Sequence, residues 1–136
     1  QESVTENYIL KTKIMKSISK NAKKNAIISS STSGLLPSRI YSQCKNPERA
    51  LVAHPFNPVY LLPGVELVPG KKTKLEYMNK AKMFYKSISL YPLFFECVSC
   101  IHAISIFFRF ILPIRFLWFV HVEKSSGFMV AMFSVL

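Results

Sequence analysis

Short apolar runs alternate with longer amphipathic segments along most of the chain. Three of the runs, residues 26–28, 50–53 and 65–68, are typical of buried strands. Two other segments, residues 5–25 and 73–88, carry apolar side chains every three or four positions, which is the period of a helix lying on a core. Because strands alternate with helices, the pattern predicts an α/β fold with a parallel sheet.

The first predicted helix begins at Thr5, a residue type that caps helices, with Glu6 in the first turn, where the helix dipole favours negative charge. Its buried face is expected to be Leu10, Ile14 and Ile18, which follow one another every four residues. The lysines expected to face water are Lys13, Lys16, Lys20, Lys23 and Lys24.

The second predicted helix begins with a capping box, in which Thr73 and Glu76 each satisfy a free backbone donor of the other. A shorter helical turn is expected from Pro37, ending before Asn46-Pro47. The expected buried face of the second helix is Met78, Ala81, Tyr85 and Ile88.

A hydroxyl-rich loop, Ser29 to Gly34, follows the first predicted strand. It lies at the carboxyl end of that strand, which is the edge where open α/β sheets bind ligands. A serine-rich turn without any ligand fits the same residues, so position alone leaves both interpretations open.

His54 and Glu66 are the chemically reactive residues of the next two predicted strands. His54 ends the second strand and precedes a loop stiffened by prolines, while Glu66 is the single carboxylate inside the third strand. A buried carboxylate is costly without a partner, and His54 is the nearest candidate in the sequence. A histidine oriented by a buried carboxylate is a general base that can take a proton from an alcohol. The alternative is a histidine with a structural role alone, which is common before proline-rich loops.

The net charge of +11 is carried mainly by residues 1–92, which hold 15 basic and 5 acidic side chains. Such an excess could indicate nucleic-acid binding. However, the lysines are spread along two predicted helices and are not clustered with aromatic residues. We therefore expect a solvated lysine-rich surface and no nucleic-acid partner.

The three cysteines, Cys44, Cys97 and Cys100, do not predict a disulfide framework or a metal site. Their number is odd, and the C-x-x-C pair has no second pair or histidine at ligand spacing. The chain opens with polar residues and shows no signal peptide, so we expect a cytoplasmic protein.

Three stretches carry a resemblance to a known family. Residues 54–63, His-Pro-Phe-Asn-Pro-Val-Tyr-Leu-Leu-Pro, followed by Val-Glu-Leu-Val, resemble the catalytic segment of the 3-hydroxyacyl-CoA dehydrogenases, and within them the L-carnitine dehydrogenase branch. Residues 1–7 are similar to the family's Gln-Glu-Ser-Val-Pro-Glu, with Thr5 where proline is usual, and residues 30–34 resemble its Ser-x-Thr-Ser motif. The likeness covers residues 1–92 and implies the second half of a Rossmann-like NAD-binding domain.

The resemblance implies a role for each catalytic residue. His54 would be the base, Glu66 would orient it, and Ser33 would hydrogen-bond the reacting oxygen. The implied reaction transfers a hydride to NAD from the 3-hydroxy carbon of a small hydroxy acid, such as L-carnitine, or of a 3-hydroxyacyl-CoA, and gives the 3-oxo product. The parent enzyme would be a homodimer.

The resemblance also implies where substrate and cofactor bind. Ser33 and Asn57 would contact both of them, and Glu6 and Lys11 match positions beside the nicotinamide ribose. NAD would supply the redox chemistry, while the protein would position it.

The sequence departs from the family in two places. Its four glycines form no Gly-x-Gly-x-x-Gly turn, so the half of the domain that binds the pyrophosphate is expected to be absent. After Pro92 the likeness ends, and the family's C-terminal substrate domain does not follow. We therefore expect a fragment of a dehydrogenase that is inactive by itself.

Residues 93–136 form an apolar tail without family resemblance. The run from residue 97 to 122 is long enough for a membrane span, but Arg109, Pro113 and Arg115 interrupt it near its middle, where charge is costly. We interpret the tail as an out-of-frame or truncated end and expect no membrane partner. The alternative is a non-enzymatic, membrane-anchored remnant of a dehydrogenase.

Overall fold

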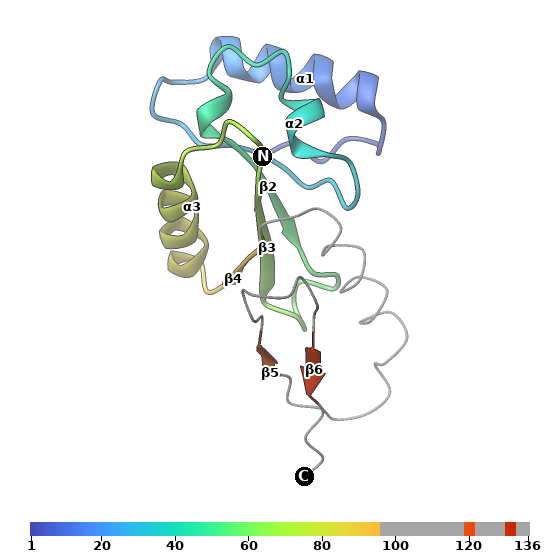
Figure 1. Ribbon diagram of the computed structural model, residues 1–136, viewed down its shortest axis with the longest axis vertical. Helices are drawn as coiled ribbons and strands as arrows, with labels where there is room; N and C mark the ends of the chain where they lie inside the picture. Colours follow the sequence, from blue (N-terminus) through green and yellow to red (C-terminus); the bar gives the residue numbers. More distant parts are fainter. Residues whose placement is uncertain (96–118, 122–129, 133–136) are drawn as a thin grey trace. The chain divides into compact units, whose positions relative to one another are not determined.

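The computed structural model describes residues 1–95, 119–121 and 130–132. The chain divides into two compact units, Gln1–Ile106 and Phe107–Leu136, and each is described by itself. In the second unit, β5 (Phe119–His121) pairs antiparallel with β6 (Val130–Met132). The described elements of the first unit, in chain order, are α1 (Tyr8–Asn21), β1 (Ile28–Ser30), α2 (Pro37–Ile40), a 3-10 turn (Pro47–Arg49), β2 (Ala50–Pro55), β3 (Gly64–Pro69), α3 (Leu75–Ser87) and β4 (Tyr91–Phe94) (Figure 1).

The sheet of the first unit has the strand order β1-β2-β3-β4. The pairs β1·β2 and β3·β4 are parallel, so the predicted α/β class with parallel strands is confirmed. The prediction of a wholly parallel sheet is wrong at its centre, where β2 and β3 run antiparallel. The reason is the connection: residues 56–63 return the chain directly, whereas a parallel crossover needs a dozen or more residues.

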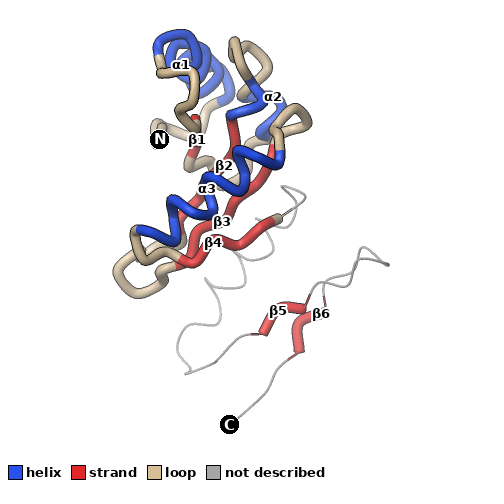
Figure 2. The backbone as a smooth tube through the Cα atoms, turned by 90° about the vertical axis from the view of Figure 1, so that its left-hand side faces the viewer, coloured by secondary structure: helices blue, strands red, loops and turns tan. Residues whose placement is uncertain are grey.

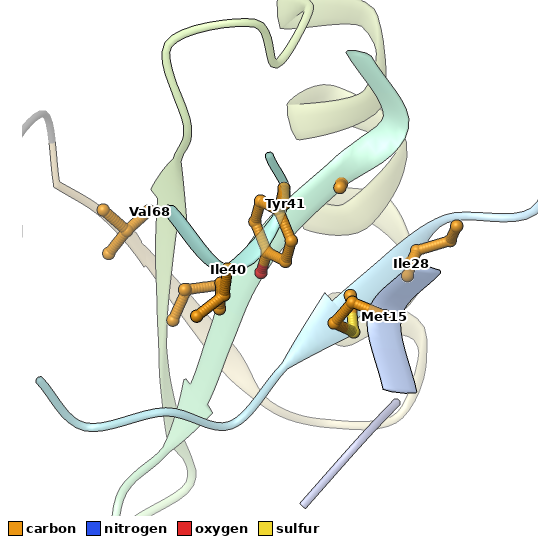
Figure 3. Packing of buried hydrophobic residues seen from close by; sticks show 7 residues of the cluster. Met15, Ile28, Ile40, Tyr41 and Val68 are labelled. Atoms are coloured by element: carbon orange, nitrogen blue, oxygen red, sulfur yellow. The ribbon is translucent and has the colours of Figure 1, made fainter. Parts of the chain in front are cut away.

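The helices cover the two faces of this sheet. Because side chains alternate along a strand, Ala50 and Val52 of β2 face α1 and α2, and Leu51 and Ala53 face α3. Figure 2 shows α3 lying along β3 and β4. Figure 3 shows the packing between α1, α2 and the strands, and the buried residues of that cluster are Met15, Ile28, Ile40, Tyr41, Ala50, Val52 and Val68.

Helix α1 differs from its prediction in its start and in its buried face. Its N-cap is Asn7, not Thr5, and the Asn7 side chain accepts a hydrogen bond of 3.0 Å from the Leu10 N–H. The buried residues are one position further along than predicted: Lys11, Met15 and Ser19 in place of Leu10, Ile14 and Ile18. A lysine can occupy this face because carboxylates meet its ammonium group there.

Helix α3 buries Met78, Ala81 and Tyr85 as predicted, whereas Ile88, at its C-cap, is 51% exposed. The predicted capping box is wrong. The Thr73 hydroxyl accepts from the Gly70 N–H at 2.8 Å and donates to the Ala50 carbonyl at 2.6 Å. The N-cap of α3 is Lys74, without a side-chain cap bond, so Thr73 ties the loop to β2 and does not cap the helix.

The apolar run of residues 97–122 lies outside the described residues except for β5. The expected boundary between residues 92 and 93 falls inside β4. Within residues 1–95 and the two short strands β5 and β6, no helix is long and apolar enough to cross a bilayer.

Replacing Gly64 by alanine should destabilise the fold by about 1–3 kcal/mol, the usual cost of overpacking. A Cβ atom at Gly64 would lie 2.4 Å from Phe56 Cδ2 and 2.6 Å from Cε2, so the ring would have to leave its position. Urea denaturation measures the change. Gly70→Ala is the matched control, since its added Cβ meets nothing closer than 3.5 Å. Equal losses in both variants would contradict the steric explanation.

Candidate functional site

His54 and Glu66 form a direct cross-strand pair on β2 and β3. They share the sheet face of Val52 and Val68, which α1 and α2 cover. His54 Nδ1 lies 2.7 Å from Glu66 Oε2, and the two side chains are 15% and 0% exposed. Glu66 Oε1 is buried and has no hydrogen-bond partner in the described part of the chain. The contact expected from the sequence is therefore present, with the histidine as the member that reaches solvent.

The loop of residues 31–34, called the Ser33 loop below, lies at the same edge of the sheet as the His54–Glu66 pair. Strands β1 and β2 are parallel, with Ser30 opposite Val52, so Ser33, past the carboxyl end of β1, and His54, next to the last residue of β2, lie toward the same edge. Ser33 is exposed, whereas Thr32 beside it is fully buried. Among the described residues no hydrogen bond joins Ser33 to His54, and the two are brought to one edge without direct contact.

Glu6 binds the Ser33 loop directly. Its Oε1 accepts the N–H groups of Ser33 and Gly34, each at 3.2 Å, and also the hydroxyl of Thr32. Burial raises the pKa of the Glu6 carboxyl, but the Thr32 hydroxyl, the Gly34 N–H and the Lys11 ammonium outweigh burial and hold this pKa below its usual value. Glu6 is therefore an ionised acceptor fixed against the loop.

Lys11 is almost fully enclosed, with 1% of its side chain exposed. Its Nζ lies 2.9 Å from the Val4 carbonyl oxygen, 3.0 Å from Glu2 Oε1 and 3.5 Å from Glu6 Oε2. The sequence identified Lys11 as a site residue but gave no role to Glu2, which is its nearest carboxylate partner. A signal was present, since two carboxylates, Glu2 and Glu6, precede the helix that carries the lysine.

Asn57, the remaining predicted site residue, is exposed in the loop that follows β2. It follows His54 by three residues, past the carboxyl end of β2. The described residues hold no group of three or more His, Cys, Asp or Glu side chains that could bind a metal ion.

An α/β sheet with helices on both faces, and polar side chains gathered where its strands end, defines the class of open-sheet domains that bind ligands at that edge. Residues 1–96 match the family model of the 3-hydroxyacyl-CoA dehydrogenase NAD-binding domain. The chain therefore belongs to this family, and its fold is a Rossmann-like sheet with NAD as the cofactor that the domain binds.

Similar proteins agree with this assignment. An L-carnitine dehydrogenase from Bacillus cereus is 50% identical over 93 residues, which are 68% of this chain and 28% of that protein. One from Pseudomonas putida is 52% identical over 93 residues, covering 68% and 29%. The crystal structure of a (S)-3-hydroxybutyryl-CoA dehydrogenase from Ralstonia eutropha gives a TM-score of 0.65 at 33% identity, covering 68% of this chain and 33% of that one. The chain thus spans less than a third of the length of these curated relatives.

Proposed function

We propose that this chain carries the catalytic part of an NAD-dependent dehydrogenase that oxidises the 3-hydroxy group of a small hydroxy acid, such as L-carnitine, or of a 3-hydroxyacyl-CoA. The observation that carries the proposal is the 2.7 Å contact between His54 and the buried Glu66 at the ligand-binding edge of the sheet. The names of the relatives support the substrate class.

In the proposed reaction His54 is the general base. Glu66, as an ionised carboxylate, accepts a hydrogen bond from the Nδ1–H of His54, which leaves the lone pair of Nε2 for the substrate hydroxyl. Nε2 takes the proton of the substrate hydroxyl, while the hydrogen on the carbon that carries this hydroxyl leaves as a hydride. Ser33, at the same edge, hydrogen-bonds the oxygen as it becomes a carbonyl. NAD, when bound, accepts the hydride.

The proposal places the cofactor on the side of Glu6, Lys11, Ser33 and Asn57. The Glu6 side chain is 41% exposed and can face the nicotinamide ribose. The Lys11 side chain is 1% exposed and contacts the Glu6 carboxylate from the protein interior. Asn57 is exposed, three residues after His54, and is available to both cofactor and substrate.

Residues 1–92 are, in this proposal, the second half of the NAD-binding domain, and residues 93–136 are a separate apolar tail. The family match, which ends at residue 96, supports a boundary near β4. We also propose that the parent enzyme is a homodimer, on the family resemblance alone, and that it is cytoplasmic. Because the sequence holds no Gly-x-Gly-x-x-Gly turn to bind the pyrophosphate, we expect the 136-residue chain to be inactive by itself.

The test is a hybrid enzyme in which residues 1–95 replace the matching segment of the Bacillus cereus L-carnitine dehydrogenase. We expect NAD-dependent oxidation of L-carnitine or of 3-hydroxybutyryl-CoA, followed by NADH absorbance, and a fall of about 10²–10⁴ in rate on His54→Ala. Gln43→Ala, at an exposed position, is the control. A folded hybrid that turns over neither substrate, or that keeps its rate without His54, would refute the proposal.

A further inference from the structure

Glu2, Lys11 and Glu6 form a continuous series of charges that ends at the Ser33 loop. Glu2 is 4% exposed and belongs to the sheet, since its N–H donates to the Ser29 carbonyl at 2.9 Å and its own carbonyl accepts from Ser31 at 3.0 Å. Both Glu2 carboxylate oxygens lie within 3.2 Å of Lys11 Nζ. The series therefore starts from a residue that the backbone holds in place.

The ammonium group of Lys11 is fully used within the chain. It has three N–H donors. Three acceptors lie around it: the Glu2 carboxylate, the Val4 carbonyl and Glu6 Oε2. With 1% of the side chain exposed, the ammonium cannot donate to a bound molecule without losing one of these acceptors.

Glu6 is held through both of its carboxylate oxygens. Oε2 faces Lys11 at 3.5 Å, and Oε1 accepts the two backbone N–H groups of the Ser33-Gly34 turn, each at 3.2 Å. Without the carboxylate, these two N–H groups would have to find other acceptors. The conformation of the turn, and with it the position of the Ser33 hydroxyl, thus depends on where Glu6 is held.

We propose that Glu2, Lys11 and Glu6 act in series as positioning residues for Ser33. Glu2 fixes the Lys11 ammonium, Lys11 fixes the Glu6 carboxylate, and Glu6 fixes the turn that presents the Ser33 hydroxyl to the reacting oxygen. The inference rests on the proposed role of Ser33 and deepens it. It gives Lys11 an indirect part in the reaction. It also adds Glu2, which is far from Ser33 in the sequence and buried in the structure.

The experiment is amide hydrogen exchange on the full chain, read by NMR at Ser33 and Gly34 and, for comparison, at Val52 and Leu67 in the core strands. In Glu6→Ala we expect exchange at the turn to rise about ten- to a hundredfold, because hydrogen bonds to a charged acceptor are lost, with core exchange unchanged. Glu6→Gln keeps a carbonyl acceptor and should restore part of the protection. A residue that serves fold stability alone would accelerate all four amides together.

Glu2 is tested through the same amides. Glu2→Gln alone leaves the Lys11 ammonium buried beside a neutral partner, so the double variant Glu2→Gln/Lys11→Met removes both charges at once. Both variants should accelerate exchange at Ser33 and Gly34 beyond any change in the core. Glu76→Gln, at an exposed carboxylate paired with Lys80 on α3, is the matched control.

The series is refuted if the Glu2 variant and the double variant accelerate exchange at the turn no more than in the core, or if Glu6→Gln and Glu6→Ala behave alike. This outcome is distinguishable from failure of the proposed function, which the hybrid enzyme and His54→Ala report. If the hybrid enzyme is inactive, the exchange rates measured on the full chain still stand. If the exchange test fails, the turnover measured in the hybrid enzyme still stands.

Discussion

Replacing Arg49 by alanine is expected to destabilise the protein by about 3–5 kcal/mol, a large part of the 5–15 kcal/mol that holds a typical domain folded. Arg49 is 2% exposed, and its guanidinium is the shared donor for backbone carbonyls near the end of α1 and in the segment that follows. Removing the side chain takes this donor from all four carbonyls in a partly buried site, and only the Lys23 carbonyl is shown to keep another one, the Ala26 N–H at 3.0 Å. The four carbonyls belong to Ser19, Lys23, Lys24 and Ala26.

Chemical denaturation followed by circular dichroism measures this loss. Arg39→Ala is the control, because Arg39 is exposed and its guanidinium lies over the Tyr8 ring at 4.0 Å, an interaction worth about 0.5–1 kcal/mol at the surface. Arg49→Lys should recover only part of the stability, since one ammonium group cannot reach the acceptors of both terminal guanidinium nitrogens. Equal midpoints for Arg49→Ala and Arg39→Ala would show that the carbonyls find water instead.

Glu66→Gln should lower the turnover of the hybrid enzyme by about 10²–10⁴, the usual contribution of a general base. The ionised Glu66 can only accept, so it places the proton of His54 on Nδ1 and leaves Nε2 basic. A glutamine amide can instead donate to Nδ1, and the proton then resides on Nε2, where the substrate hydroxyl would need a base. The substitution is nearly isosteric, so packing around the buried site changes little.

Two measurements check this prediction. Turnover in the hybrid gives the rate, and long-range ¹H–¹⁵N NMR on the full chain shows which ring nitrogen of His54 carries the proton. Glu76→Gln, on the solvent side of α3, should alter neither. A loss of turnover with the proton still on Nδ1 would mean that Glu66 acts by charge and not by orienting the ring.

The paired His54 and Glu66 could be predicted because the sequence isolates them. A single carboxylate inside an apolar run needs a partner, and the nearest ionisable residue of the preceding strand is the one it contacts. Their catalytic roles are implied by the family resemblance, because the spacing of the residues in the sequence fits a structural histidine as well.

Other contacts could not be read from the sequence, and in each case the reason is a long-range interaction. Lys11 looks like one of many solvated lysines until Glu2, part of the sheet, is placed beside it. Arg49 gives no local signal, since its acceptors lie 23 to 30 positions away in the chain. The antiparallel direction of β3 was accessible in principle from the short length of the 56–63 connection, but the apolar pattern of the strand carries no direction.

The antiparallel pairing of β2 and β3 makes the reactive pair a property of strand register. His54 and Glu66 are directly opposite and only 12 positions apart, so the connecting hairpin sets their alignment. A slip of one residue would turn the carboxylate to the α3 face and leave the imidazole opposite an aliphatic side chain. Changes of loop length between the two strands should therefore be tolerated only where they preserve this alignment. The length of the hairpin thus decides whether His54 and Glu66 meet.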